Sequence, residues 1–415
     1  MKDDGPNKRH PTIAIPRVLW WFRQWPFWKT FFEGLGCRII TNDPARPTRR
    51  RHERASTIVE EACFPIQLLI DRTLAIAEQA DAIFMPRLIS VVPRGIMCPR
   101  FTGVPDIVRM VLEQGRKRDV RGGRWEAGSE REEPGNERRE AGSGKEEEKT
   151  GKRPTSCAFV PPPTSRLSPL TATGCQPVLL APAIDARLGR GSVRKAYLTV
   201  AAQLGASPAQ ARQAFRQAIA VEDHFDAQFE TRLNHLPTPE VFDIAEDTGT
   251  FLQQSKIKNL KSKIGEGPPP ALHRPRVALL GHPYVTLDWE FNLAIVDKLR
   301  SFGVWVVPVE AVAHRQIEAS VKKLDKNIYW SSGREVLGAA LSFFEKGGVE
   351  GVIYLSCFKC GVDGLLTEVV RWAARHQSQV AYLPLTLDGH DNEMGLMTRL
   401  EAFVDIVRRR AQRPT

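Results

Sequence analysis

The sequence predicts an α/β fold made of two doubly wound parallel-sheet domains that face each other across a cleft. Short apolar segments alternate with longer segments whose apolar residues recur at helical spacing. This alternation occurs twice, once on each side of a long stretch of low complexity. Strands that alternate with helices are typical of a parallel sheet with helices on both faces.

The N-terminal half contains four short segments that have the composition of buried strands. We predict strands at Thr12–Pro16, Cys37–Thr41, Asp81–Pro86 and Pro177–Pro182. Capping residues and apolar spacing predict the helices between them. These helices are Trp20–Leu35, interrupted by Pro26; Ile58–Gln79, which Ser56 can cap; and Ser207–Asn234, which opens on a Ser-Pro pair.

The C-terminal half repeats the scheme. Its strands are predicted at Arg276–Gly281, Val304–Val309, Val352–Ser356 and Val380–Leu387. Its helices are predicted at Asp288–Phe302, Arg334–Lys346, Asp363–His376 and Met394–Arg409.

Changes in composition set the predicted domain limits. Residues 114–174 are rich in Arg, Glu and Gly and then in Pro, Ser and Thr, so they cannot bury enough apolar surface to offset the entropy of ordering. We therefore predict a disordered insertion there. The first domain then comprises residues 11–113 with 175–258, a linker covers 259–274, and the second domain covers 275–415.

Composition excludes several classes of function. The chain has 415 residues and a net charge of +11, but the excess is scattered and no RNA-binding or zinc-finger signature is present, so we expect no nucleic-acid partner. No apolar run approaches the ~20 residues that a membrane helix requires. The first ten residues lack the apolar core of a signal peptide, and a cytoplasmic protein is expected. Walker A and G-x-G-x-x-G motifs are absent, which argues against ATP or NAD binding.

Three of the seven cysteines fall at positions that topology brings together. Open α/β sheets bind ligands beyond the carboxyl ends of their strands. Cys98 follows the third strand of the first domain, Cys360 follows the third strand of the second, and Cys63 lies near the start of a helix at the same rim. A helix start favours the thiolate that binds metals, and clustered thiolates favour iron–sulfur or zinc. The alternative is that each cysteine is a small buried apolar residue.

Other candidates follow the strands of the second half. Cys357 and Cys360 form a C-x-x-C pair, but it ends a strand instead of opening a helix, which argues against a thioredoxin-like dithiol. His282 and Tyr284 follow the first strand and can transfer protons or donate hydrogen bonds. Asp388 and His390 follow the last strand and are candidates for the same two roles, proton transfer and hydrogen bonding. For each of these, an ordinary polar turn is the alternative interpretation.

Several separate motifs, in order, resemble the activase-related branch of the 2-hydroxyacyl-CoA dehydratase family. In the first half they are Ile15–Arg17, Pro26–Phe32, Glu61–Pro65, Pro86–Arg87 and Cys98–Pro99. In the second half they are Gly281–Tyr284, Tyr329–Trp330, Ser356–Asp363, Leu385–His390, Gly395 and Thr398–Phe403.

This resemblance implies two Rossmann-like domains and a [4Fe-4S] cluster. In the dehydratases that the chain resembles, three cysteines hold the cluster and one iron stays open to the substrate; Cys63, Cys98 and Cys360 match these positions. An ATP-dependent actin-like activator, which carries its own iron–sulfur cluster, injects one electron. The resulting ketyl radical of a 2-hydroxyacyl-CoA can lose its hydroxyl group. Cys357 stands where this branch commonly has a small residue other than Cys, and Gly389 replaces a usually acidic residue.

The resemblance leaves three activities open. The chain is expected to act as a lyase component for acyl-CoA dehydration or reduction, alone or with a paralogous subunit. A small-molecule reductase with a double-cubane cluster is the second reading. A non-catalytic iron–sulfur scaffold or electron-transfer subunit is the third.

Overall fold

The computed structural model describes residues 10–42, 62–120, 177–236, 241–242, 274–377, 380–388 and 392–411. Within these ranges the chain builds two four-stranded parallel sheets, one in each half. In the first sheet the strand order is β2-β1-β3-β5. Its strands are β1 (Thr12–Ala14), β2 (Arg38–Ile40), β3 (Ala82–Phe84) and β5 (Val178–Leu180).

The second sheet has the order β10-β9-β7-β8. Its strands are β7 (Arg276–Leu280), β8 (Trp305–Pro308), β9 (Gly351–Cys357) and β10 (Ala381–Leu387). Every residue of β9 is buried, as expected for a central strand that is covered on both faces.

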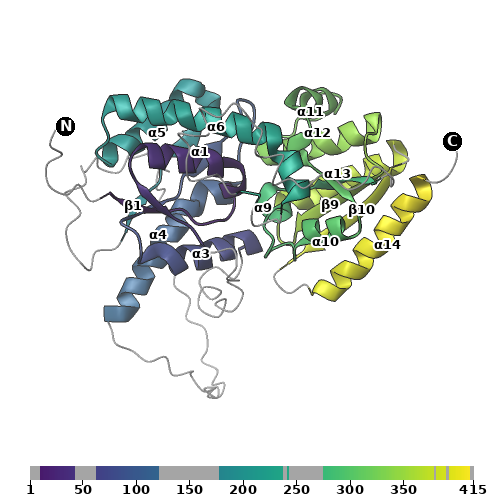
Figure 1. Ribbon diagram of the computed structural model, residues 1–415, viewed down its shortest axis with the longest axis horizontal. Helices are drawn as coiled ribbons and strands as arrows, with labels where there is room; N and C mark the ends of the chain where they lie inside the picture. Colours follow the sequence, from purple (N-terminus) through teal and green to yellow (C-terminus); the bar gives the residue numbers. More distant parts are fainter. Residues whose placement is uncertain are drawn as a thin grey trace, which may run out of the picture.

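Helices cover both faces of each sheet (Figure 1). In the first half these are α1 (Trp21–Gly34), α3 (Phe64–Ala77), α4 (Pro99–Val120), η2 (Ala186–Leu188), α5 (Arg190–Gln203) and α6 (Pro208–His235). In the second half they are α9 (Pro283–Thr286), α10 (Ile295–Ser301), η4 (Val309–Ala311), α11 (His314–Val321), α12 (Ser331–Lys346), α13 (Gly361–Gln377) and α14 (Glu393–Ala411). The predicted α/β fold class is confirmed. No helix in the described part of the chain is long and apolar enough to cross a membrane.

Two predicted helices have different limits in the structure. The helix expected over Asp288–Phe302 is reduced to α10, because Leu293 and Ala294 adopt left-handed backbone angles with φ of 57° and 55°. The helix expected from Ile58 is described from Phe64 onward, directly after Cys63. Pro65 lies in its first turn, where the missing N–H costs nothing. Ser56, its expected cap, lies outside the described residues.

Three further features were not expected from the sequence. A small parallel sheet pairs β4 (Arg87–Ser90) with β6 (Ala183–Asp185). The helices α4, α5 and α11 were also missed. Helix α4 continues to Val120 and so crosses the predicted start of the insertion at residue 114. The remainder of that predicted insertion, and residues 259–273 of the predicted linker, lie outside the described residues.

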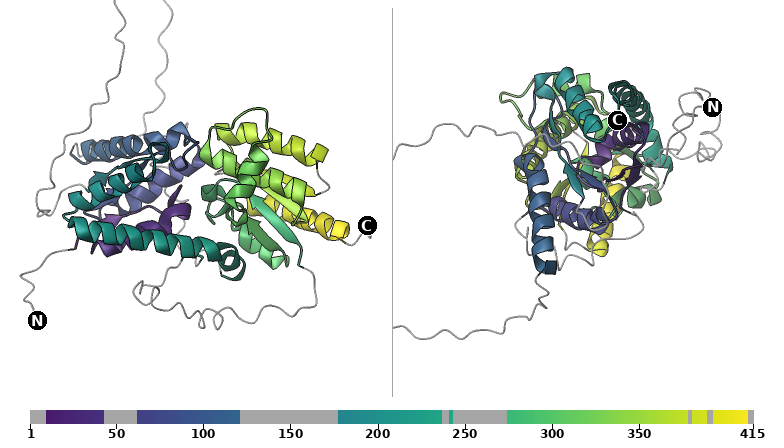
Figure 2. Two further views of the ribbon diagram at one scale, coloured as in Figure 1. Left: turned by 90° about the horizontal axis from the view of Figure 1, so that it is seen from above. Right: turned by 90° about the vertical axis from the view of Figure 1, so that its left-hand side faces the viewer.

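The two halves are joined by buried polar contacts. Helix α6 runs from the first half to the edge of the second sheet, as Figure 2 shows from above. At its end the Asn234 amide donates to the Val306 carbonyl at 2.7 Å and accepts from the Val306 N–H at 2.8 Å. Since β8 is the edge strand of its sheet, Asn234 pairs backbone groups that the sheet leaves free. These contacts fix the end of α6 against the edge of the second sheet.

Candidate functional site

Three helices begin directly after a cysteine. Cys63 precedes α3, Cys98 precedes α4 and Cys360 precedes α13. The first N–H groups of a helix have no partner within it, and together they carry a partial positive charge. The Ile66 N–H lowers the pKa of the Cys63 thiol, and the N–H groups of Val362 and Asp363 lower the pKa of the Cys360 thiol, although burial has the larger, opposite effect on both. Each helix start therefore favours a negative sulfur.

The three cysteines line a single cavity between the two halves. Cys63 and Cys98 come from the first half, and Cys360 comes from the second. The cavity and its mouth enclose about 340 Å³ free of protein atoms. Two cationic residues, Arg100 and Lys359, also line it, and Arg100 is hydrogen-bonded to the Cys63 sulfur. All three cysteines thus lie on the wall of one cavity.

Burial favours the protonated form of the Cys63 and Cys360 thiols. Burial raises the pKa of Cys63, although the charge of Arg100 opposes this rise. Burial also raises the pKa of Cys360 to about 12, and the nearby Asp363 carboxylate acts in the same direction. A soft metal deprotonates the thiols that it binds, so these two shifts do not prevent ligation but make it release protons.

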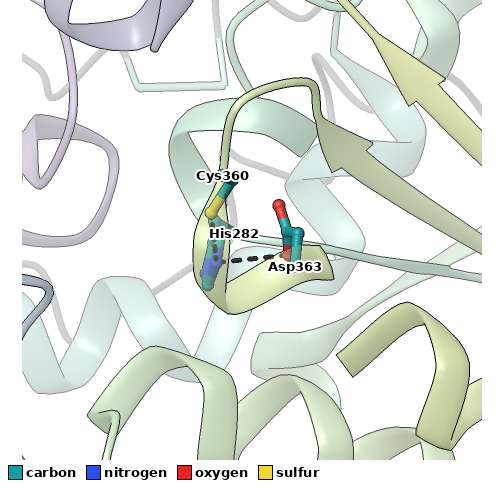
Figure 3. A group of neighbouring side chains, drawn as sticks. All are labelled: His282, Cys360 and Asp363. Carbon is teal, nitrogen blue, oxygen red and sulfur yellow. Dashed lines mark hydrogen bonds and ion pairs between the residues drawn. The ribbon is translucent and has the colours of Figure 1, made fainter. Parts of the chain in front are cut away.

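His282 lies beside Cys360 and Asp363 (Figure 3). Its Nε2 atom is 4.0 Å from the Cys360 sulfur and 3.3 Å from Oδ1 of Asp363. The imidazole is almost fully buried, and its Nδ1 atom has no hydrogen-bond partner among the described residues. His282 follows β7 through Gly281, where a Cβ atom would lie 2.3 Å from the Leu355 carbonyl oxygen. The close approach of the two strand ends thus requires glycine just before the histidine.

Asp363 is the residue at this site that sequence reasoning missed. Its Oδ1 accepts a hydrogen bond from the Tyr354 hydroxyl at 2.9 Å, and its Oδ2 accepts one from the Cys357 backbone N–H at 3.1 Å. These bonds fix a buried carboxylate against His282. The available signal was an acidic residue one turn after Cys360, a place where the helix dipole alone also favours it.

Tyr284 lines the cavity and stacks on His282, with ring centroids 5.2 Å apart and planes inclined by 15°. Burial raises the pKa of its hydroxyl well above the ordinary value, and the Asp363 carboxylate adds to the effect. Tyr284 therefore stays protonated and can donate a hydrogen bond to a group in the cavity.

Asp388 and Cys357 are not among the residues that line the cavity. Asp388 directly follows β10 and is half-buried. His390 lies outside the described residues. Cys357 is buried as the last residue of β9, and its thiol donates to the Phe358 carbonyl at 3.0 Å. Cys37 lies just before β2, at the opposite, amino-terminal edge of the first sheet.

This arrangement offers two sets of metal ligands. The three cysteines form an all-sulfur set, which suits an iron–sulfur cluster. His282, Cys360 and Asp363 form a mixed set whose ligand atoms all lie within 4.8 Å of one another. A mixed N, S, O set is typical of a single zinc or iron ion. Both sets contain Cys360, so one occupant would exclude the other.

Comparison with known families gives one match. Residues 12–122 and 145–312 match the family described as the CoA enzyme activase uncharacterised domain. The match covers more than half of the chain and contains Cys63, Cys98, His282 and Tyr284. Cys360 and Asp363 lie beyond its end. No curated protein matches the sequence.

Proposed function

Since the chain belongs to the family of the CoA enzyme activase uncharacterised domain, we propose that it carries a [4Fe-4S] cluster on Cys63, Cys98 and Cys360. The cluster receives a low-potential electron from an ATP-dependent, actin-like activator. It serves the dehydration or reduction of an acyl-CoA. The observation that carries this proposal is that three helices begin at three cysteines on the wall of one cavity.

The donor set fits the proposed group. Three thiols supply soft ligands, and the N-termini of α3, α4 and α13 with Arg100 and Lys359 offset the negative charge of an iron–sulfur centre. When bound, such a cluster supplies one-electron transfer, and an iron without a protein ligand can accept a substrate oxygen.

The surrounding side chains supply positioning and proton handling. Asp363 orients the buried His282, which can hold or release a proton at Nε2 beside Cys360. Tyr284 retains its proton and can donate a hydrogen bond to an oxygen in the cavity. Leu19, Ile66 and Phe101 give part of the cavity wall a buried apolar surface, whereas Lys359 and Gly361 are exposed.

Metal analysis separates this proposal from its competitors. Protein purified without oxygen should contain about four iron and four acid-labile sulfide per chain. A double-cubane reductase would contain about twice as much of each. A mononuclear site on His282, Cys360 and Asp363 would contain about one metal ion and no sulfide.

The cysteine variants make the test specific. Serine is a preferred N-cap, so Cys63→Ser, Cys98→Ser and Cys360→Ser keep the helix starts while removing the sulfur. Each should lose most of the iron and sulfide, whereas Cys37→Ala, which alters a buried cysteine elsewhere, should retain both. If the three serine variants fold and keep full iron and sulfide, the proposal is wrong.

Spectroscopy addresses the role of the cluster. Addition of an acyl-CoA should change the electron paramagnetic resonance spectrum of the reduced protein when an iron is open to the substrate. An unchanged spectrum with every thioester tested would favour a scaffold or electron-transfer subunit.

A further inference from the structure

A second cavity adjoins the thiol-lined one, at the carboxyl ends of β1 and β3. The described residues that line this cavity are all apolar or aromatic. Leu69, Phe84 and Val104 are among them, and each is almost completely buried. The indole N–H of Trp28, also on the wall, already donates to the Tyr197 hydroxyl at 3.0 Å. The cavity therefore presents hydrocarbon and no unmet polar group, which suits an uncharged apolar occupant.

Two side chains belong to both cavities. Leu19 and Phe101 line the apolar cavity and also the thiol-lined cavity. Phe101 lies one turn after Cys98 and contacts a ring on either side: the Trp20 ring, at 6.3 Å and 88°, and the Tyr284 ring, at 5.5 Å and 54°. The boundary between a polar, thiol-bearing space and an apolar space thus consists of these two side chains.

Leu19 is held in an unfavourable backbone conformation at this boundary. Its φ angle is 55°, in the left-handed region that is unfavourable for a residue with a Cβ. Such strain persists where the surrounding structure imposes it, and it concentrates at ligand sites. The neighbours of Leu19 in the sequence, Val18 and Trp20, line only the apolar cavity. Leu19 itself lines the apolar cavity and the thiol-lined cavity.

We propose that the apolar cavity binds the hydrocarbon chain of an aliphatic acyl group whose carbonyl end lies among the thiols. The placement of the carbonyl end rests on the proposed function, while the apolar site itself does not. Leu19 and Phe101 stand at the passage between head and tail and limit the width of the chain. Each methylene that enters should tighten binding about four-fold, because burial of a methylene contributes ~0.8 kcal/mol.

Xenon is a direct probe of the apolar cavity, since it occupies dry cavities without needing a polar partner. Xenon-129 NMR of the wild-type chain should show a bound signal. Val104→Phe fills this cavity and should abolish that signal. Val111→Phe lies two turns further along α4, in a separate gap against α3, and should leave the signal unchanged. Val104→Leu adds one carbon, carries little risk of overpacking, and should weaken the signal.

Acyl probes test the proposed occupant. Butanoate, hexanoate and octanoate, and their N-acetylcysteamine thioesters, should displace xenon with affinity that rises with chain length until the cavity is full. Tighter displacement by the thioesters would identify the thioester as the source of the acyl group, and tighter displacement by the acids would identify the free acid. Failure of both series to displace xenon, or a xenon signal that survives Val104→Phe, would overturn the inference.

The same titration on Cys63→Ser protein keeps this inference separate from the proposed function. Xenon binding should persist there, because the apolar wall is intact. Loss of iron in that variant with retained xenon binding supports both proposals. Iron loss together with loss of the xenon signal would refute the separate apolar site.

Discussion

Arg72 and Asp288 form a buried, two-pronged ion pair that joins the first half of the chain to the second. Nη1 of Arg72 lies 2.5 Å from Oδ2 of Asp288, and Nη2 lies 3.0 Å from Oδ1. Nη2 also contacts Glu290 at 2.9 Å. Because Arg72 lies on α3, the helix that follows Cys63, this pair fixes that helix against the half that carries Cys360.

We expect Arg72→Ala to destabilise the protein by about 3–5 kcal/mol, because it leaves two buried carboxylates without their cation. Chemical denaturation measures the loss. Lys323→Ala, which breaks an exposed pair with Glu345, should cost no more than about 1 kcal/mol. Equal losses in the two variants would contradict the importance of the buried pair.

Asn234→Ala should expose the edge of the second sheet. The substitution leaves the Val306 N–H and carbonyl unpaired in a buried place, at a cost of roughly 2–3 kcal/mol. Hydrogen exchange at the Val306 amide should accelerate, while exchange at Val352, in the centre of the same sheet, should change much less. Unchanged protection of Val306 would show that the amide contact contributes little.

Glu222 is expected to make the stability of the protein fall as the pH rises. Burial and the nearby Asp226 raise its pKa to about 8 against an ordinary 4.5, although Arg23 opposes the shift. Between these two values the folded state binds more protons than the unfolded state, so the free energy of unfolding decreases with increasing pH. Glu222→Gln removes this dependence and should be more stable than the wild type at pH 9, with the advantage vanishing near pH 4.5.

Glu318→Gln provides a control, because the pKa of Glu318 is shifted in the opposite direction to that of Glu222. The hydrogen bond from Arg334 lowers the pKa of Glu318, so its contribution is present above the ordinary pKa and is lost as the pH falls. This variant should gain no stability at pH 9. Urea titrations at several pH values, which give the free energy of unfolding, distinguish the two patterns.

Gly281→Ala should disrupt the site through the backbone. The added Cβ would meet the Leu355 carbonyl oxygen at 2.3 Å, so the turn that positions His282 must shift. We expect a loss of several kcal/mol in stability, by analogy with overpacked cores, and reduced iron content after anaerobic purification. Gly364→Ala, in open space on α13, should be neutral or stabilising by up to about 1 kcal/mol. A stable Gly281→Ala protein with full iron would refute this account.

Cys357→Ser should retain iron and sulfide, in contrast to Cys360→Ser. Its thiol is absent from the cavity wall and donates to a backbone carbonyl, a bond that a serine hydroxyl can also make. Metal analysis of the two variants in parallel decides the point. Loss of iron in Cys357→Ser would make this residue a fourth ligand.

The sequence predicted the parts of the fold that depend on local patterns. The strands of both sheets and the helices α1, α6, α12, α13 and α14 follow apolar periodicity and capping signals. The failures have tertiary causes. The left-handed residues Leu293 and Ala294 interrupt a periodic segment, and β4 begins at Arg87, just beyond Pro86, where the predicted strand ended. Neither effect is encoded in residue type.

The site was predictable where topology alone decides position. The rule that ligands gather at the carboxyl ends of parallel strands selected Cys63, Cys98 and Cys360, and they share one cavity. The same rule selected Asp388, which does not line it. Asp363 and the apolar cavity beyond Leu19 were not predictable, because both depend on side chains from separate elements meeting in space.

The division of the three thiols between the halves has a consequence for biosynthesis. Cys63 and Cys98 leave the ribosome long before Cys360 is translated, and N-terminal units generally fold first. A nascent chain therefore presents an incomplete pair of sulfurs until its last sheet has formed. The pocket can therefore be completed only at the end of translation. A chain truncated before Cys360 would lack the third sulfur.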